Sequence, residues 1–151
     1  MKKIILLFCF WFTFGCSGYQ PIFSSKDSTF YIEGLESLNN DKIAYQINSR
    51  LSGYKIKDVN KKNYNLSISS KKDIEVISRD SKGNSQLYKM IINVSVTVIS
   101  DQKLIKKIDL NESFSYSNNE NKFSLNQYKK EIEENLISKI SEDLILRLQI
   151  L

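Results

Sequence analysis

The amino-acid sequence predicts an α+β protein: a two-layer sandwich with two helices on one face of a four-stranded, mixed but largely antiparallel sheet. Three observations lead to this prediction. Apolar and polar residues alternate along several segments, which is typical of strands with one buried face. Two other segments repeat apolar residues every three or four positions, which is typical of amphipathic helices. Along the chain, these segments follow the order βαβββα.

The first predicted strand and helix occupy residues 29–35 and 37–52. Gly34 weakens the end of the strand, and Asn39 or Asn40 is expected to cap the helix. Because this helix can serve as a crossover, the first strand can pair in parallel within a mixed sheet.

Residues 64–78 contain two apolar stretches in which hydrophobic and polar residues alternate. The pattern leaves open whether this segment is one bent strand or two. Residues 80–84 then read Asp-Ser-Lys-Gly-Asn, a composition that predicts the reversing turn of a hairpin.

The clearest strand is residues 87–99, and after a turn at residues 100–103 the alternation continues through residue 116. These segments predict an antiparallel meander. The apolar face should consist of Tyr88, Met90, Ile92, Val94, Val96 and Val98, followed by Leu104, Ile108, Leu110, Phe114 and Tyr116.

The last segment predicts a helix that covers the sheet. Ser124 stands three residues before Gln127, a capping-box pair that would open this helix. Its apolar stripe should contain Leu125, Tyr128, Ile132, Leu136, Ile140, Leu144 and Leu148, widened by Ile137 and Ile145.

Residues 1–15 have the organisation of a secretory signal peptide: a basic Lys2-Lys3 start, an apolar run and a small residue before Cys16. The apolar run of about 11 residues would be roughly 16 Å long as a helix, too short to span a bilayer. Gly15-Cys16 resembles the bacterial lipobox, in which the cysteine receives lipid, although Thr13 and Phe14 depart from its usual pattern and leave the efficiency of modification open.

This interpretation divides the chain into a lipoprotein signal peptide (1–15), a lipidated tether (16–28) and a single α+β domain (29–151). Three acyl chains on Cys16 would attach the protein firmly to a membrane. Ser17 stands where an Asp would resemble an inner-membrane retention signal, which favours the outer membrane. An ordinary secretory leader with an incidental cysteine is the alternative.

Composition excludes several classes of function. The chain has no histidine, and its two cysteines are Cys9 in the leader and Cys16, so the usual zinc sites, Cys–His pairs and Ser–His–Asp triads are excluded. Loss of Lys2 and Lys3 leaves 20 basic and 17 acidic residues, a charge of +3 too dispersed for a nucleic-acid groove. No catalytic motif is present, so we expect that the protein is not an enzyme and binds no cofactor or metal.

Residues 16–23, Cys-Ser-Gly-Tyr-Gln-Pro-Ile-Phe, resemble the Cys-Gly-Phe-x-Pro-Leu-Tyr opening of the lipopolysaccharide-assembly lipoproteins of the LptE type. Residues 83–98 and 136–148 are similar to the later part of that family in order and character. The resemblance implies two helices against a four-stranded mixed sheet. It also implies an outer-membrane lipoprotein that sits inside an LptD-type β-barrel, supports barrel assembly and helps lipopolysaccharide reach the outer leaflet.

Family members are thought to contact lipopolysaccharide through basic residues. The candidates surround the predicted hairpin and are Lys71, Lys72, Arg79, Lys82 and Lys89. A solvated strand edge protected by lysines explains the same residues without a ligand. Tyr19 and Phe23 are candidates for the barrel interface, whereas Tyr88 and Phe114 are in phase with the core.

The alternative function is a small α+β binding module, of inhibitor or adhesin type, displayed from the outer membrane and unrelated to lipopolysaccharide export. That alternative predicts a self-sufficient monomer. The barrel-plug interpretation instead predicts a chain that copurifies with a large integral β-barrel.

Overall fold

The computed structural model describes residues 28–38 and 41–151. Predictions for the leader, Cys16, Tyr19 and Phe23 lie outside the described residues, as do Asn39 and Asn40. The elements are β1 (Phe30–Ser37), α2 (Lys42–Arg50), the 3-10 turn η3 (Ser52–Tyr54), β2 (Lys62–Arg79), β3 (Ser85–Ser100), β4 (Lys103–Ser117) and α3 (Lys122–Gln149).

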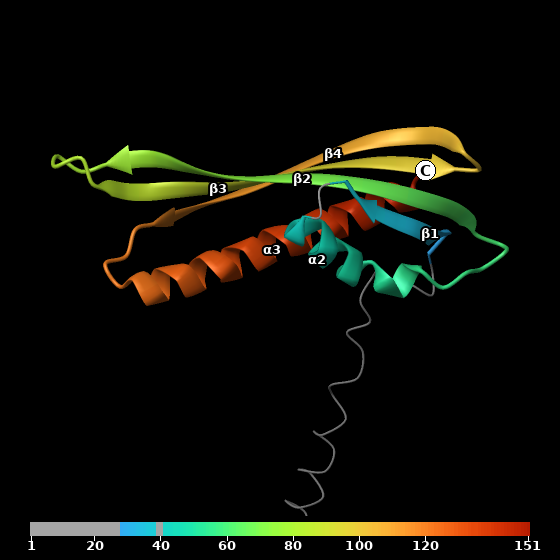
Figure 1. Ribbon diagram of the computed structural model, residues 1–151, viewed down its shortest axis with the longest axis horizontal. Coiled ribbons are helices and arrows are strands. Elements are labelled where there is room, and N and C mark those ends of the chain that lie inside the picture. Colours follow the sequence, from blue (N-terminus) through green and yellow to red (C-terminus); the bar gives the residue numbers. More distant parts are fainter. Residues whose placement is uncertain (1–27, 39–40) are drawn as a thin grey trace, which may run out of the picture.

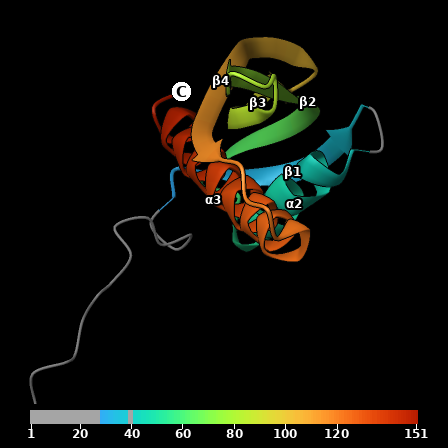
Figure 2. The same cartoon turned by 90° about the vertical axis from the view of Figure 1, so that its left-hand side faces the viewer.

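The four strands form one sheet in the order β1-β2-β3-β4, and both helices lie on the same face of it (Figures 1 and 2). β1 pairs in parallel with β2, and the other two pairings are antiparallel. α2 supplies the crossover between the parallel strands. The predicted α+β sandwich with order βαβββα is therefore confirmed.

Strand β3 supplies the centre of the core because its apolar face is covered by the helices. Met90, Ile92, Val94, Val96 and Val98 are all at most 1% exposed. From α2 the core includes Ile43, Ala44 and Ile47, and Leu51 directly after the helix joins them. From α3 it includes Leu125, Ile132, Leu136, Ile137, Ile140, Leu144 and Leu148.

The segment left open at residues 64–78 belongs to one continuous strand of 18 residues. Its pairing with β3 runs from Asn65 opposite Ile99 to Arg79 opposite Ser85, with shifts in register between Val76 and Arg79. The polar residues between its two apolar stretches do not interrupt the strand, because the ladder to β3 satisfies the backbone.

Both predicted helix starts are wrong in detail. Asp41 caps α2, because its carboxylate accepts a hydrogen bond from the Ile43 backbone N–H at 3.0 Å. Asn121 caps α3 by accepting from the backbone N–H groups of Phe123 and Ser124, both at 3.1 Å. Ser124 therefore lies inside the helix, because the side chain that reaches the first free N–H groups comes three residues earlier.

Strand β1 does not weaken at Gly34 but continues to Ser37, with a shift in register between Ile32 and Gly34. A Cβ at Gly34 would lie 2.6 Å from Asn65 Oδ1 on β2, so the glycine leaves room for the Asn65 side chain.

Two residues predicted for the apolar face of β4 are largely exposed. Leu104 is 59% exposed, because a register shift after Val98 pairs it with Ile99 and turns it out of phase with Ile108. Phe114 remains in phase but is 44% exposed, because α3 leaves this part of β4 partly uncovered. In the predicted stripe of α3, Tyr128 is likewise 43% exposed.

Candidate functional site

The far half of the β2–β3 hairpin extends away from α2, and its tip passes the start of α3 (Figure 1). This follows from element lengths. The 18 residues of β2 span about 60 Å, whereas the nine of α2 span about 14 Å. α2 therefore covers only the first part of β2, and of the two helices only α3 reaches the second part, through Glu133. We call residues 71–89 the distal hairpin.

Asp80 organises the turn of the distal hairpin. Its Oδ1 accepts hydrogen bonds from the backbone N–H groups of Lys82 at 2.9 Å and Asn84 at 2.8 Å, and its Oδ2 accepts from the Asn84 side chain at 3.1 Å. Gly83 adopts a left-handed conformation with φ of 85°, as glycine does readily. Hydrogen bonds from the side chain and backbone of Asn84, chiefly, lower the pKa of Asp80.

Two candidate cations lie at this turn. The Arg79 guanidinium donates to the Gly83 carbonyl at 2.9 Å, which ties the arginine to the turn while its side chain stays exposed. Lys82 is exposed beside it in the turn. The structure thus places both residues together at the tip, as the sequence predicted.

The other three candidate cations do not join this pair. Lys71 forms an ion pair with Asp73 at 2.9 Å, and Lys89 lies opposite Glu75 on the same, uncovered sheet face. Lys72 points to the helical side, where its ammonium lies 2.8 Å from the Glu133 carboxylate of α3. The five residues are therefore spread over the tip and both faces of the distal hairpin.

Sequence reasoning missed an exposed apolar strip on the helical side of this region. Ile74, Met90 and Phe114 lie opposite one another across β2, β3 and β4. Met90 is buried, but Ile74 is 46% and Phe114 44% exposed. Val76, one alternation further along β2, is 39% exposed. We call Ile74, Val76 and Phe114, together with Tyr128 of α3, the distal apolar strip.

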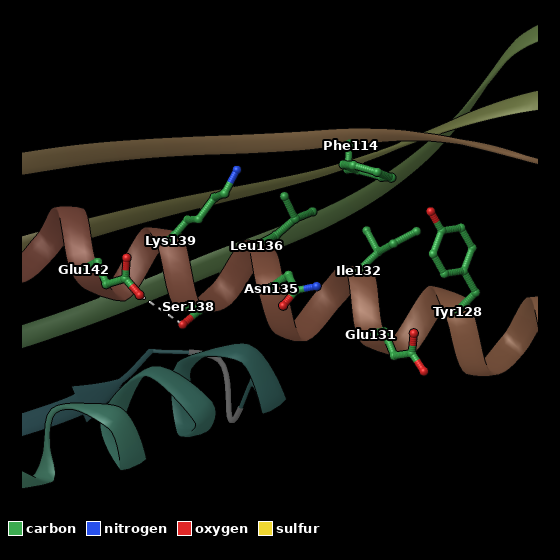
Figure 3. A pocket seen from close by; sticks show the side chains of 9 residues that line it. All are labelled: Phe114, Tyr128, Glu131, Ile132, Asn135, Leu136, Ser138, Lys139 and Glu142. Atoms are coloured by element: carbon green, nitrogen blue, oxygen red, sulfur yellow. Dashed lines mark hydrogen bonds between the residues drawn. The ribbon is translucent and has the colours of Figure 1, made fainter. Parts of the chain in front are cut away.

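A cleft of about 440 Å³ lies between β4 and α3, and Figure 3 shows Phe114 facing α3 across it. Its apolar lining comes from Phe114, Tyr128, Ile132 and Leu136. The polar lining consists of Glu131, Asn135, Ser138, Lys139 and Glu142, all on α3. The cleft continues the distal apolar strip along the helix.

Three tyrosines and a lysine fill the region where the distal hairpin meets α3. The rings of Tyr88 and Tyr116 stack at 5.5 Å, Tyr128 meets Tyr116 edge-on at 6.4 Å, and Lys129 Nζ lies 5.6 Å from the Tyr88 ring centre. Tyr116 is only 2% exposed, and burial, followed by repulsion from Tyr88, raises its pKa. Its buried hydroxyl has no hydrogen-bond partner among the described residues.

The described part of the chain contains no group of three or more His, Cys, Asp or Glu side chains placed to hold a metal ion. None of its described helices is sufficiently long and apolar to cross a membrane. What this site offers chemically is a surface of cations and exposed aliphatic and aromatic side chains. Such a surface suits an anionic amphiphile or a protein wall that is partly apolar.

A family model described as "LptE: Lipopolysaccharide-assembly" matches residues 28–148, which is most of the chain. The chain belongs to the LptE family. The resemblance seen in the sequence is thereby confirmed, and LptE is a lipopolysaccharide-assembly family. No curated protein sequence matches the chain.

Solved structures share the LptE-family fold of this chain at low sequence identity. Rare lipoprotein B from Shewanella oneidensis has a TM-score of 0.60 at 16% identity, covering 78% of this chain and 91% of its own. A minor lipoprotein from Acinetobacter baumannii has 0.61 at 14%, covering 82% and 92%. Lipoprotein B from Nitrosomonas europaea has 0.59 at 7%, covering 81% and 86%.

Proposed function

We propose that this LptE-family chain is an outer-membrane lipoprotein, anchored through Cys16, that sits inside an LptD-type β-barrel and assists the assembly of lipopolysaccharide at the outer membrane. The observation that carries the proposal is the family match over residues 28–148. In this proposal the chain performs no enzymatic step, and its partners are the barrel, lipopolysaccharide and the membrane that holds its acyl chains.

The distal hairpin supports this role by its shape and chemistry. It extends beyond α2 as a long, narrow arm (Figure 1), a form that fits into the lumen of a wide barrel. Arg79 and Lys82 at its tip match the phosphates of lipopolysaccharide, since several cations can bind phosphate by charge-assisted hydrogen bonds. The distal apolar strip supplies a surface for the barrel wall or for acyl chains.

The test is a mild-detergent pull-down of the tagged, lipidated chain from envelopes of its own host, with mass spectrometry of the recovered proteins. We expect one large β-barrel protein in stoichiometric amount. A matched sample that carries Cys16→Ala should lose membrane attachment when the barrel is depleted. Recovery of the lipoprotein alone would contradict the barrel-plug role and favour the free binding module.

A second measurement separates lipopolysaccharide contact from barrel contact. Arg79→Glu combined with Lys82→Glu should weaken binding of purified lipopolysaccharide, because both charges at the tip are reversed. Lys42→Glu combined with Lys130→Glu reverses two exposed charges on α2 and α3. This pair is the matched control and should bind normally. Unchanged binding by the first pair would remove the hairpin tip as the contact.

A further inference from the structure

The end of the molecule opposite the hairpin tip carries exposed side chains that have no role in the proposed function. Hydrogen bonds bring four separate segments together there. The Lys62 backbone N–H donates to the Thr29 carbonyl at 3.1 Å, and the Thr29 hydroxyl donates to the Gln149 carbonyl at 3.2 Å. Asn63 joins β2 to the β3–β4 turn through Ser100 and Asp101. We call this region the basal end.

Exposed aliphatic side chains cluster at the basal end. In the loop of residues 55–61, Ile56 is 75% and Val59 is 86% exposed. Just after the β3–β4 turn, Leu104 is 59% and Ile105 is 47% exposed, and Ile150 near Gln149 is 82% exposed. Single exposed aliphatic residues are common on protein surfaces, but five at one end of a chain of this size form a feature that needs an explanation.

Lysines alternate with these aliphatic residues in both segments. Residues 55–59 read Lys-Ile-Lys-Asp-Val, and residues 103–107 read Lys-Leu-Ile-Lys-Lys. The loop continues into Lys61 and Lys62. The acidic side chains nearby are Asp58, which lies 3.9 Å from Lys61, Asp101 in the turn and Glu33 on β1. Positive charge therefore predominates at the basal end.

We propose that the basal end lies outside the barrel lumen, beside the tether, against the surface of an anionic phospholipid bilayer. Ile56, Val59 and Leu104 would then lie among the lipids, with the neighbouring lysines at the level of the phosphates. Aliphatic side chains enter the boundary between headgroups and acyl chains, while lysine stems let the ammonium groups remain at the headgroups. Anionic lipid attracts such clusters of lysine by charge complementarity.

The position of the tether favours this occupant over others. Ser28, the first described residue, is at the basal end, where Lys61 Nζ lies 3.4 Å from its hydroxyl. Cys16 precedes it by twelve residues, which span at most about 42 Å. The hairpin tip lies roughly 56 Å further along β2. A lipid on Cys16 would therefore hold the basal end near the bilayer, and to this extent the inference depends on the proposed anchor.

The test measures contact with lipid at each end of the molecule. The single tryptophan, Trp11, lies in the leader, so a mature chain that begins at Cys16 has none. Val59→Trp places a probe at the basal end, and Phe123→Trp places a matched probe at the start of α3, near the hairpin, where Phe123 is 78% exposed. Each lipidated variant is reconstituted in phosphatidylglycerol-rich vesicles that contain lipid brominated on its acyl chains.

We expect bromolipid to quench more than about half of the Val59→Trp fluorescence and less than about a tenth of the Phe123→Trp fluorescence. Adding Lys55→Glu and Lys57→Glu to Val59→Trp, or replacing phosphatidylglycerol with phosphatidylcholine, should reduce the quenching at least about threefold. Equal quenching of both probes, or none at Val59→Trp, would overturn the inference.

Flotation of the same vesicles distinguishes this inference from the proposed function. A chain that floats without quenching at Val59→Trp keeps its anchor and contradicts only the contact at the basal end. A chain that does not float contradicts the anchor at Cys16 as well, and with it both proposals.

Discussion

At the scale of single residues, Asp80 shows how one carboxylate sets the geometry of the distal hairpin. Its oxygens accept hydrogen bonds from the backbone of Lys82 and Asn84 and from the Asn84 and Gln86 side chains. These bonds require an acceptor, so they favour the ionised carboxylate and lower its pKa from the ordinary 3.8.

The turn should therefore depend on pH in a defined direction. Because the folded-state pKa of Asp80 lies below its unfolded value, its contribution to stability is present above about pH 4 and is lost as the pH falls through the folded pKa. NMR signals of the Lys82 and Asn84 amides should keep their positions between about pH 7 and pH 5 and shift at lower pH. Asp80→Asn should remove that shift, and a persistent shift in this variant would contradict the assignment.

Tyr116 provides a second test at this scale. Its hydroxyl is buried without a hydrogen-bond partner in the described structure, and an unpaired buried polar group costs about 1–3 kcal/mol. Tyr116→Phe removes this group and keeps the ring stacked on Tyr88, so the free energy of unfolding should rise by about 1 kcal/mol. Tyr116→Ala should lower it by about 3–5 kcal/mol in the same urea titration. A destabilised Phe variant would indicate that the hydroxyl has a partner.

At the scale of elements, the starts of the helices depend on which side chain reaches the free backbone N–H groups. The sequence offers several capping residues before each helix. Asp41 caps α2 and also accepts a hydrogen bond from the Ser70 hydroxyl, which links the start of the helix to β2. Since this second partner comes from a distant part of the chain, local sequence patterns do not report it.

The cap of α3 can be tested by replacing the observed and the predicted capping residue by alanine, one at a time. Asn121→Ala should lower the free energy of unfolding by about 1 kcal/mol, because two backbone N–H groups lose their acceptor. Ser124→Ala is the matched control and should have almost no effect or a slightly stabilising one, since alanine is a better helix former than serine. Thermal unfolding of both variants gives the comparison, and equal destabilisation would restore Ser124 as a cap.

At the scale of the whole molecule, two surfaces that each combine cations with exposed apolar side chains are separated by the length of β2. The distal hairpin carries two cations at its tip and an apolar strip beside α3. The basal end carries alternating lysines and aliphatic residues next to the start of the described chain. The two surfaces lie at opposite ends of the longest axis of the domain (Figure 1).

The distal apolar strip should matter for binding more than for folding. Ile74→Ser combined with Val76→Ser should lower the free energy of unfolding by only about 1 kcal/mol, because both side chains are already 39–46% exposed. The same pair should reduce recovery of the barrel partner in the pull-down several-fold. Ile56→Ser combined with Val59→Ser at the basal end is the control and should leave recovery in detergent unchanged. Equal recovery with both pairs would exclude the strip from the interface.

Periodicity in the sequence was sufficient for the fold class and for most of the core. The alternation in β3 and the stripe of α3 identified the buried faces correctly, apart from Leu104, Phe114 and Tyr128. Of the predicted cations, Arg79 and Lys82 lie together because they flank one turn. Lys72 lies apart from them because period two turns it to the helical side, where Glu133 of α3 pairs with it.

By itself, then, the sequence determined the order of the elements, the face that each buries and the resemblance to the LptE family, since all three are properties of local spacing and composition. Only the tertiary structure decided that β2 is one strand, that α2 covers just its first part, and that two distant lysine-containing segments lie at the same end of the molecule. The physical reason is that an apolar residue on a strand is buried only where another element lies above it. Which element that is depends on relative lengths and long-range pairing.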